Sequence, residues 1–230
     1  MSVSRIAAPA VPRWSAAVPK RLRPTAPIAA DALLVGDPGR ALMLAQELLG
    51  EPRMSNHARG LWGYTGLTPA GRELTIQATG MGGPSASIVL IDLAELGLRR
   101  AVRVGTCVAV DSAHGTGALL EISEAWAAAD AIRPDPELSR RLRGELGPGA
   151  ARAAIASVDH LPLGPATLPS AVGAADLQTA TVLARAHALG IAAAAVLIVE
   201  EAAGGERITD IELERAAKSA GRAARTVLSS

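Results

Sequence analysis

One arginine stands inside an apolar run and is the first candidate for chemistry. In RVGTCVAV, residues 103–110, Arg103 begins a stretch whose other residues are typical of a buried strand. An arginine keeps its proton, and burying it unpaired costs on the order of several kcal/mol. Its head must therefore reach solvent, meet a carboxylate or bind an anion. The candidate internal carboxylates for an ion pair with Arg103 are Asp92, Glu95 and Glu121.

Polar and flexible residues stand at the ends of two expected strands. In GDPGR, Gly36 lets the backbone approach a ligand, Asp37 and Pro38 are suited to begin a helix, and Arg40 projects from its first turn. In RVGT, Thr106 adds a hydroxyl at the carboxyl end of a strand, where ligands collect in open α/β sheets. The alternatives are a plain turn and an internal ion pair.

Two further motifs carry weaker signals. The loop GMGGPS, residues 80–85, joins a strand to a helix N-terminus and favours anions, but close helix–strand packing explains it equally well. As a dinucleotide fingerprint it is incomplete, because Ser85 stands where the third glycine belongs. The run IVEE, residues 198–201, ends a strand in two carboxylates, either a general acid or a solvated strand end.

The elements that must position these residues alternate along the chain, which predicts an α/β fold. Residues 1–30, with five prolines and four arginines, are expected to form an arm, and residues 31–230 a single domain. Expected strands cover 32–35, 73–79, 98–110, 117–126, 151–159 and 191–201, and expected helices cover 40–49, 84–96, 135–146, 174–190 and 209–228.

Composition excludes several classes of function. A net charge of +1 and 2% aromatic residues without phenylalanine argue against a nucleic-acid partner. The single Cys107 excludes an intramolecular disulfide framework and a multi-cysteine zinc site, and it fits a reducing cytoplasm. We expect no membrane span, because no run approaches about 18 consecutive apolar residues.

Taken in order, the motifs resemble the purine nucleoside phosphorylase/uridine phosphorylase superfamily. The resemblance rests on LLVGDPGRALMLAQELL (33–49), NHARGLWGYTG (56–66), ATGMGGPSASIVLIDLAELG (78–97) and VRVGTCVAV (102–110), and is dense over about residues 30–130. It implies a three-layer α/β/α subunit around a mixed, partly barrel-like sheet. It also implies reversible attack of phosphate on C1′ of a nucleoside, which gives free base and ribose 1-phosphate.

The resemblance assigns phosphate to a set of residues that includes three arginines. Phosphate would be held by Gly36, Arg40, Arg103, Thr106 and, from the neighbouring subunit, Arg59. The catalytic unit would be a homodimer, often assembled into hexamers, with inorganic phosphate as co-substrate and neither cofactor nor metal. Because related nucleosidases use water and need no such cluster, the arginines favour phosphorolysis.

The nucleoside end of the motif pattern departs from the family. The residues that would face the nucleoside are Met81, Cys107, His160, Leu177 and Gln178. A Glu-Met-Glu run is replaced by Asp176-Leu177-Gln178, so that the ionic acceptor for the ribose hydroxyls becomes a neutral amide. Glu201 would protonate the departing base, oriented by Arg207 or Arg215, of which Arg215 is our assignment.

These departures leave alternatives to an ordinary phosphorylase. The chain is expected to be a working phosphorylase of unusual nucleoside substrate. A protein that has lost turnover but still binds nucleoside or phosphate is the main alternative. A water-dependent nucleosidase and, more weakly, a dinucleotide-dependent enzyme complete the set.

Overall fold

The computed structural model describes residues 20–128, 130–161, 168–169 and 171–230. In chain order its elements are β1 (Asp31–Val35), α1 (Pro38–Leu48), β2 (Gly50–Asn56), a 3₁₀ turn (Ala58–Gly60), β3 (Gly63–Leu67), β4 (Glu73–Ala78), α2 (Gly82–Glu95), β5 (Arg100–Ala109), β6 (Leu119–Ala127), β7 (Asp130–Ile132), α3 (Pro136–Leu146), β8 (Ala151–Ser157), β9 (Val172–Asp176), α4 (Thr179–Ala188), β10 (Ala192–Glu201) and α5 (Asp210–Leu228). No helix in this part of the chain is both long and apolar enough to cross a membrane.

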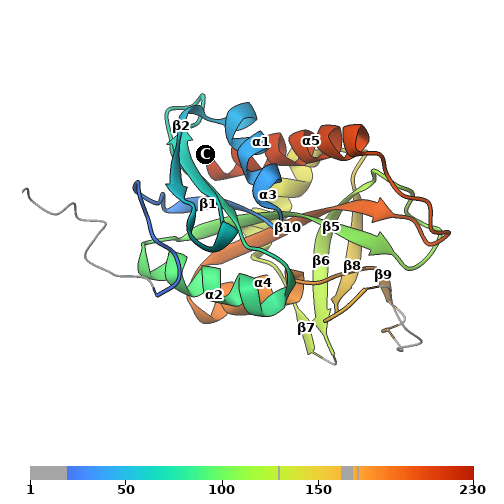
Figure 1. Cartoon of the computed structure of the whole chain (residues 1–230). Coiled ribbons are helices and arrows are strands. Elements are labelled where there is room, and N and C mark those ends of the chain that lie inside the picture. The colour runs from blue at the N-terminus through green and yellow to red at the C-terminus, as the bar shows by residue number, and fades with distance from the viewer. Residues whose placement is uncertain (1–19, 129, 162–167, 170) are drawn as a thin grey trace, which may run out of the picture.

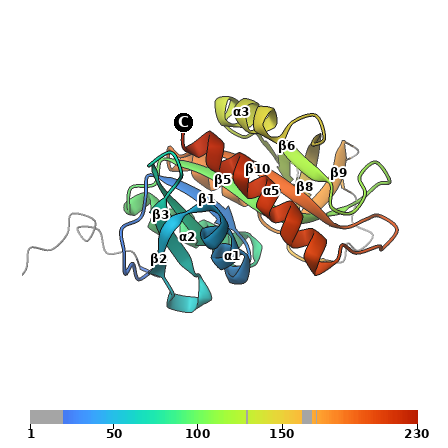
Figure 2. The same ribbon diagram turned by 90° about the horizontal axis from the view of Figure 1, so that it is seen from above.

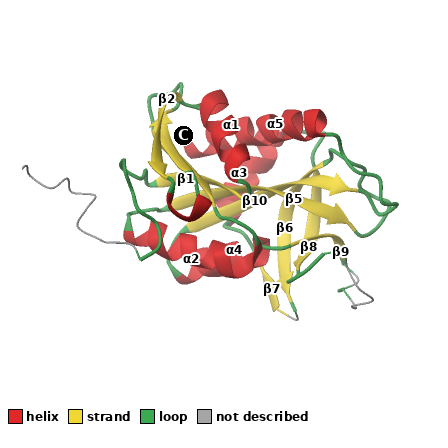
Figure 3. Cartoon of the chain, viewed as in Figure 1, coloured by secondary structure: helices red, strands yellow, loops and turns green. Residues whose placement is uncertain are grey.

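The strands form one mixed sheet that closes on itself at one end. In the described residues the ten strands run in the order β10-β6-β8-β9-β5-β1-β4-β3-β2, with β7 beside β6. Strand β10 pairs with β6 and also with β5, so that β5, β10, β6, β8 and β9 make a closed ring. The expected mixed and partly barrel-like sheet is confirmed (Figures 1 and 3).

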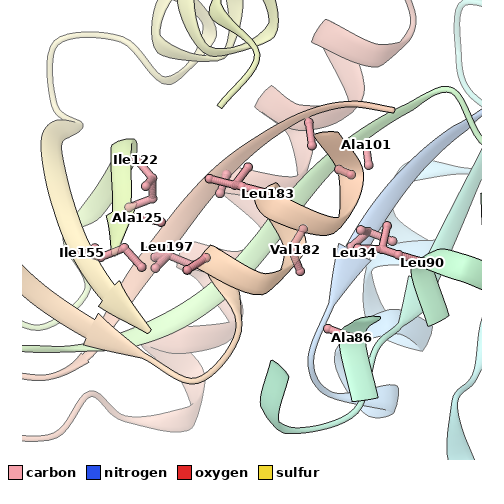
Figure 4. Close-up of a cluster of buried hydrophobic side chains, with 14 of the residues drawn as sticks. Leu34, Ala86, Leu90, Ala101, Ile122, Ala125, Ile155, Val182, Leu183 and Leu197 are labelled. Atoms are coloured by element: carbon pink, nitrogen blue, oxygen red, sulfur yellow. The ribbon is translucent and has the colours of Figure 1, made fainter. Parts of the chain in front are cut away.

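Helices cover both faces of the sheet and enclose two apolar cores. Helices α1, α3 and α5 lie on one face and α2 and α4 on the other (Figure 1), and α5 crosses over the sheet in Figure 2. Side chains of β5 alternate between the faces: Val102 and Val104 join the core under α1 and α5, whereas Ala101 and Cys107 join the core against α2 and α4. Arg103 therefore points toward α2 and α4. Figure 4 shows this second core.

Three parts of the sheet differ from the sequence-based expectation, one of them the short strand β7, which was not predicted. Residues 174–190 were expected to form one helix, but the segment to Asp176 is strand β9 and the helix begins at Thr179. Alanines 174 and 175 pair with β5 and β8, a tertiary contact that overrides their helix propensity. The β2–β3 hairpin was also not predicted, because GEPRMSN has little apolar alternation to indicate a strand.

The chain joins the domain before the expected boundary at residue 31. Leu22 is fully buried, and the backbone N–H groups of Arg21 and Leu22 donate to Asp92 Oδ2 at 2.7 and 2.8 Å. Further along, the N–H of Ala29 donates to Thr75 Oγ1 at 2.8 Å. Residues 20–30 thus pack as part of the domain rather than as an arm.

An ion pair at the start of β5 anchors the end of α5. Arg100 Nε and Nη2 each donate to the Asp31 carboxylate at 2.7 Å, and Nη2 also donates to the carbonyl of Leu228 at 2.7 Å. The hydrogen bonds to Asp31 raise the pKa of Arg100, whereas partial burial opposes this.

We expect Arg100→Met to lower the free energy of unfolding by about 2 kcal/mol, because it removes two hydrogen bonds to the buried Asp31 carboxylate and leaves only the exposed Arg72, 4.0 Å away, as a cation near it. Urea denaturation measures the loss. Arg99→Met, at the exposed neighbouring position, is the matched control and should change little. Equal effects of the two substitutions would contradict an anchoring role.

Candidate active site

The Arg103 guanidinium is buried and held by the junction between β9 and α4. Its side chain is 5% exposed, and all three nitrogens donate to protein groups. The acceptors are Thr179 Oγ1 at 3.0 Å from Nε, Gln178 Oε1 at 2.8 Å from Nη1 and Asp176 Oδ2 at 3.1 Å from Nη2. Of the three ways to accommodate this arginine, the structure thus contains the ion pair.

Asp176 is the carboxylate in this ion pair, and it is itself fully enclosed. It accepts from the hydroxyls of Ser157 and Thr179 at 2.6 Å each, and from the N–H of Thr179. The sequence-based candidates Asp92, Glu95 and Glu121 were wrong as partners of Arg103. Because residues 174–178 were assigned to a helix, the strand that carries Asp176 past β5 was not foreseen.

Gln178 joins Arg103 to the glycine loop. The residue is 2% exposed, and its Oε1 lies 2.8 Å from Arg103 Nη1 and 3.0 Å from the Thr79 hydroxyl. Its Nε2 donates to the carbonyl of Gly80 and, at 3.2 Å, to that of Gly82. Both glycines have positive φ, +72° and +77°, which explains the residue type at these positions. A side chain expected to face the sugar thus makes its hydrogen bonds within the protein.

Arg40 lies at the start of α1 as the sequence predicted. Asp37 caps the helix by accepting from the Arg40 N–H at 2.6 Å, and Pro38 is its first residue. Burial lowers the pKa of Arg40; the charge of Arg103 acts in the same direction, and Asp37 and Glu200 oppose it. The Arg40 guanidinium makes no hydrogen bond or ion pair with the residues that the structure describes. Arg40 and Arg103 therefore bring two positive charges to one region, and the guanidinium N–H groups of Arg40 have no acceptor among the described residues.

Gly36 and Thr106 lie on the neighbouring strand ends. Gly36 follows β1, and a Cβ added to it would stand 3.5 Å from the carbonyl oxygen of Gly80 in the glycine loop. Thr106 is half-buried on β5 and pairs with Ile198 of β10. The fold thus gathers the segments of four of the five expected phosphate residues, on β1, α1 and β5.

The two carboxylates at the end of β10 share one arginine. Arg207 Nη2 lies 2.8 Å from Glu200 Oε1, and Arg207 Nε lies 3.8 Å from Glu201 Oε2. The register with β5 shifts between Val199 and Glu201, so Glu200 occupies a β-bulge, a feature that re-aims side chains near sites. The negative charge of Glu200 acts on Arg40, where it favours the protonated guanidinium and so opposes the lowering of the pKa by burial. The sequence indicated the pair of carboxylates and favoured Glu201 as the acid, but the bulge at Glu200 leaves no pattern in one sequence.

Arg215, our assigned partner for Glu201, lies exposed on α5. No hydrogen bond or ion pair joins it to either carboxylate in the described residues, and its charge acts instead on Glu212. Arg207 is the arginine that contacts the carboxylates.

Cys107 is enclosed in the core rather than facing a ligand. It is 3% exposed, and its thiol lies 3.6 Å from the carbonyl of Ile198. Burial raises the thiol pKa far above its usual range, and the charge of Asp176 adds to this while that of Arg103 opposes it.

We expect the Cys107 thiol of the folded protein to react with an aromatic disulfide reagent about a hundredfold more slowly than in the urea-unfolded chain. Absorbance of the released thiolate at pH 8 measures both rates. Equal rates would contradict the burial of this side chain.

The remaining nucleoside-facing candidates lie apart from the arginines. His160 and Leu177 line a cavity of about 680 Å³, with residues from the first turns of α2 and α4 and from the end of β8. The lining includes neither Arg40 nor Arg103. Met81, before α2, is 85% exposed. The structure does not bring these three side chains into one cavity with the arginines.

Arg59 lies in the 3₁₀ turn between β2 and β3. It is exposed and has left-handed backbone angles, φ 60° and ψ 20°, which are uncommon for a residue other than glycine. No contact joins it to Arg40 or Arg103 within the described part of this subunit. Over the same residues, no group of three or more His, Cys, Asp or Glu side chains is arranged to hold a metal.

Comparisons with known proteins give partial sequence matches and a match to the fold. The chain is 45% identical over 84 residues to a DeoD-type purine nucleoside phosphorylase of Oceanobacillus iheyensis, a match that covers 36% of this chain and 35% of that protein. A protein of the same name from Clostridium novyi is 44% identical over 85 residues, 36% of each chain. The chain thus spans about a third of the length of the curated relatives it matches.

Among solved structures, the crystal structure of uridine phosphorylase from Vibrio fischeri ES114 superposes with a TM-score of 0.74. It has 16% sequence identity and covers 87% of this chain and 92% of its own. No family model matches the chain. The likeness extends beyond the matched sequence segment only at the level of the fold.

Proposed function

Since the chain resembles the purine nucleoside phosphorylase/uridine phosphorylase superfamily in its motifs and its fold, as its sequence predicted, we propose that it is a nucleoside phosphorylase. The reaction is phosphate-dependent cleavage of the N-glycosidic bond. The observation that carries the proposal is Arg40, a half-buried cation beside Arg103 that makes no ion pair with the described residues. Arg40 supplies a positive charge without a protein counter-charge, and Arg103, whose charge Asp176 balances, adds N–H donors, a combination that suits an anion such as phosphate.

The chemistry at phosphate uses the donors that the ion pair leaves free. A guanidinium has five N–H groups, and the contacts of Arg103 to Asp176, Gln178 and Thr179 require only three of them. The others, with Arg40, Thr106 and the backbone at Gly36, hold phosphate in place. Held there, phosphate lies in line with the bond to be broken, and its charge stabilises an oxocarbenium-like sugar.

The reaction then balances as a displacement at C1′. A phosphate oxygen forms the new bond to C1′ as the C1′–N bond breaks, and the base departs with the electron pair. Glu201 donates a proton to the departing base, and Arg207, 3.8 Å from its carboxyl group, stabilises the carboxylate that remains. The products are free base and a sugar 1-phosphate.

The assembly and compartment belong to the same proposal. Arg59 reaches the phosphate of a neighbouring subunit, so the working unit is a homodimer or a hexamer built from dimers. The exposed position and strained backbone of Arg59 support this, because they present the cation away from its own subunit. We assign the protein to the cytoplasm, with inorganic phosphate as co-substrate and no cofactor.

A nucleoside panel incubated with and without phosphate tests the proposal. Release of base only with phosphate is the expected result. Release without phosphate would identify a nucleosidase. Binding of a nucleoside in calorimetry without release of base from any member would leave a binding protein instead.

The two carboxylates of β10, Glu200 and Glu201, are predicted to contribute differently to turnover. Glu201→Gln should lower kcat about a hundredfold, because it removes the proton donor. Glu200→Gln should change kcat only a few-fold and lower the KM for phosphate, because it removes a negative charge near Arg40. Steady-state kinetics of both variants decide, and the reverse pattern would assign the acid to Glu200.

A further inference from the structure

Gln178 directs its side-chain hydrogen bonds to groups inside the protein. Its amide oxygen lies within hydrogen-bond distance of two groups, Arg103 Nη1 and the Thr79 hydroxyl, and its amide nitrogen donates to the carbonyls of Gly80 and Gly82. The Thr79 hydroxyl has one proton, which the carbonyl of Val35 can also accept at 2.9 Å, so the hydrogen bonds inside the protein use both donors and at least one of the two acceptor sites of this carboxamide. At 2% exposure the residue is also closed to solvent.

These contacts connect two parts of the anion site that are distant in sequence. One is the guanidinium of Arg103 on β5, and the other is the glycine loop that leads from β4 into α2. The turn at Gly36 lies against the same loop, because a Cβ on Gly36 would come within 3.5 Å of the Gly80 oxygen. The loop's position therefore affects both the backbone at Gly36 and the orientation of Arg103.

We propose that Gln178 is a positioning residue that fixes the glycine loop against Arg103 for phosphate binding, and that it does not contact the sugar. The proposal rests on the phosphorylase function above, and it identifies a different task for a residue that the motif pattern assigns to ribose. Asp176 and Thr179 hold the other two nitrogens of the same guanidinium. Gln178 alone among the three reaches the glycine loop through its side chain in the described structure.

The amide is required at this position, and a carboxylate of the same shape does not replace it. In Gln178→Glu an oxygen takes the place of Nε2 and faces the carbonyl oxygens of Gly80 and Gly82, so that two donations become repulsions. The variant keeps its contact with Arg103 but releases the loop. Gln178→Met fills similar space with no charge, and it loses the hydrogen bonds to Arg103 as well as those to the glycine loop.

Gln77 provides a matched control. It is also fully buried, lies on β4, and donates from its amide nitrogen to the carbonyls of Leu61 and Ala78, at 2.9 Å each. Gln77→Glu therefore makes the same chemical change against the same kind of acceptors, without touching Arg103 or the glycine loop. A general loss of stability should follow from both glutamate variants.

The experiment uses the full chain and measures three quantities for the wild type, Gln178→Glu, Gln178→Met and Gln77→Glu. Hydrogen exchange reports on a peptide covering residues 79–86, calorimetry gives the dissociation constant of inorganic phosphate, and kinetics give the ratio of kcat/KM for a ribonucleoside over its 2′-deoxy analogue. Both Gln178 variants should exchange about tenfold faster in the peptide and bind phosphate about tenfold more weakly, with the sugar ratio within about threefold of wild type. Gln77→Glu should leave all three quantities near their wild-type values.

Each contrary result has a separate meaning. A tenfold change in the sugar ratio would show that Gln178 acts on the sugar, and wild-type phosphate affinity in both Gln178 variants would remove its positioning role; either overturns the inference. If the wild-type protein binds no phosphate, the proposed function fails. In that case the exchange data still decide: faster exchange confined to the Gln178 variants supports the coupling of loop and arginine, and unchanged exchange overturns it.

Discussion

Arg103→Met should lower the free energy of unfolding by about 3–5 kcal/mol, the largest stability effect expected for any substitution at the site. The substitution leaves the Asp176 carboxylate, which is 1% exposed, without a cation in a region where water cannot replace it. Chemical denaturation of the purified variant measures the change.

A second substitution separates the buried charge from the loss of packing. In the double variant Arg103→Met, Asp176→Asn, the uncompensated charge is gone, so part of the stability should return. Arg140→Met is the control, because Arg140 pairs with Glu137 at 2.7 Å on the surface and screening by water leaves little to lose. A double variant that is no more stable than Arg103→Met would contradict a dominant role for the ion pair.

Arg40→Met should raise the KM for phosphate about a hundredfold, because it removes charge-assisted hydrogen bonds to a dianion. Unlike Arg103, Arg40 has no ion pair in the described structure, and burial lowers its pKa, so folding disfavours its charged form. The melting temperature of this variant should therefore not fall. Steady-state kinetics with varied phosphate measure the KM, and a thermal melt measures the melting temperature.

Arg40→Lys tests the geometry of the same contact. It keeps the charge but loses the planar pair of donors, so we expect a KM for phosphate between those of wild type and Arg40→Met. A melting temperature that falls in Arg40→Met as far as in Arg103→Met would contradict the distinction between a free and a paired arginine.

The sequence predicted those features that depend on local pattern. Asp37 and Pro38 begin α1 where a capping residue and a first-turn proline belong, and the buried strand around Arg103 is β5. The resemblance supplied what no single pattern contains, the closure of the sheet into a partial barrel. Arg40 and Arg103 come to the same region because α1 begins just after β1, and β1 lies beside β5 in the sheet.

The sequence did not predict contacts made by segments whose local pattern is misleading. The alanine-rich residues before Gln178 favour a helix, yet they pair with β5 and form strand β9. This pairing places Asp176 against Arg103. Whether Gln178 faces a ligand or the protein depends on the path of the glycine loop, which is a tertiary property. The bulge at Glu200 likewise depends on the register between β10 and β5.

The most direct test of phosphorolysis is ³¹P nuclear magnetic resonance of the protein with a cleavable nucleoside and inorganic phosphate. A sugar 1-phosphate resonance should grow in step with free base while the inorganic phosphate signal declines equally. Free base with an unchanged phosphate signal, or no base at all across the nucleoside panel, would contradict phosphorolysis.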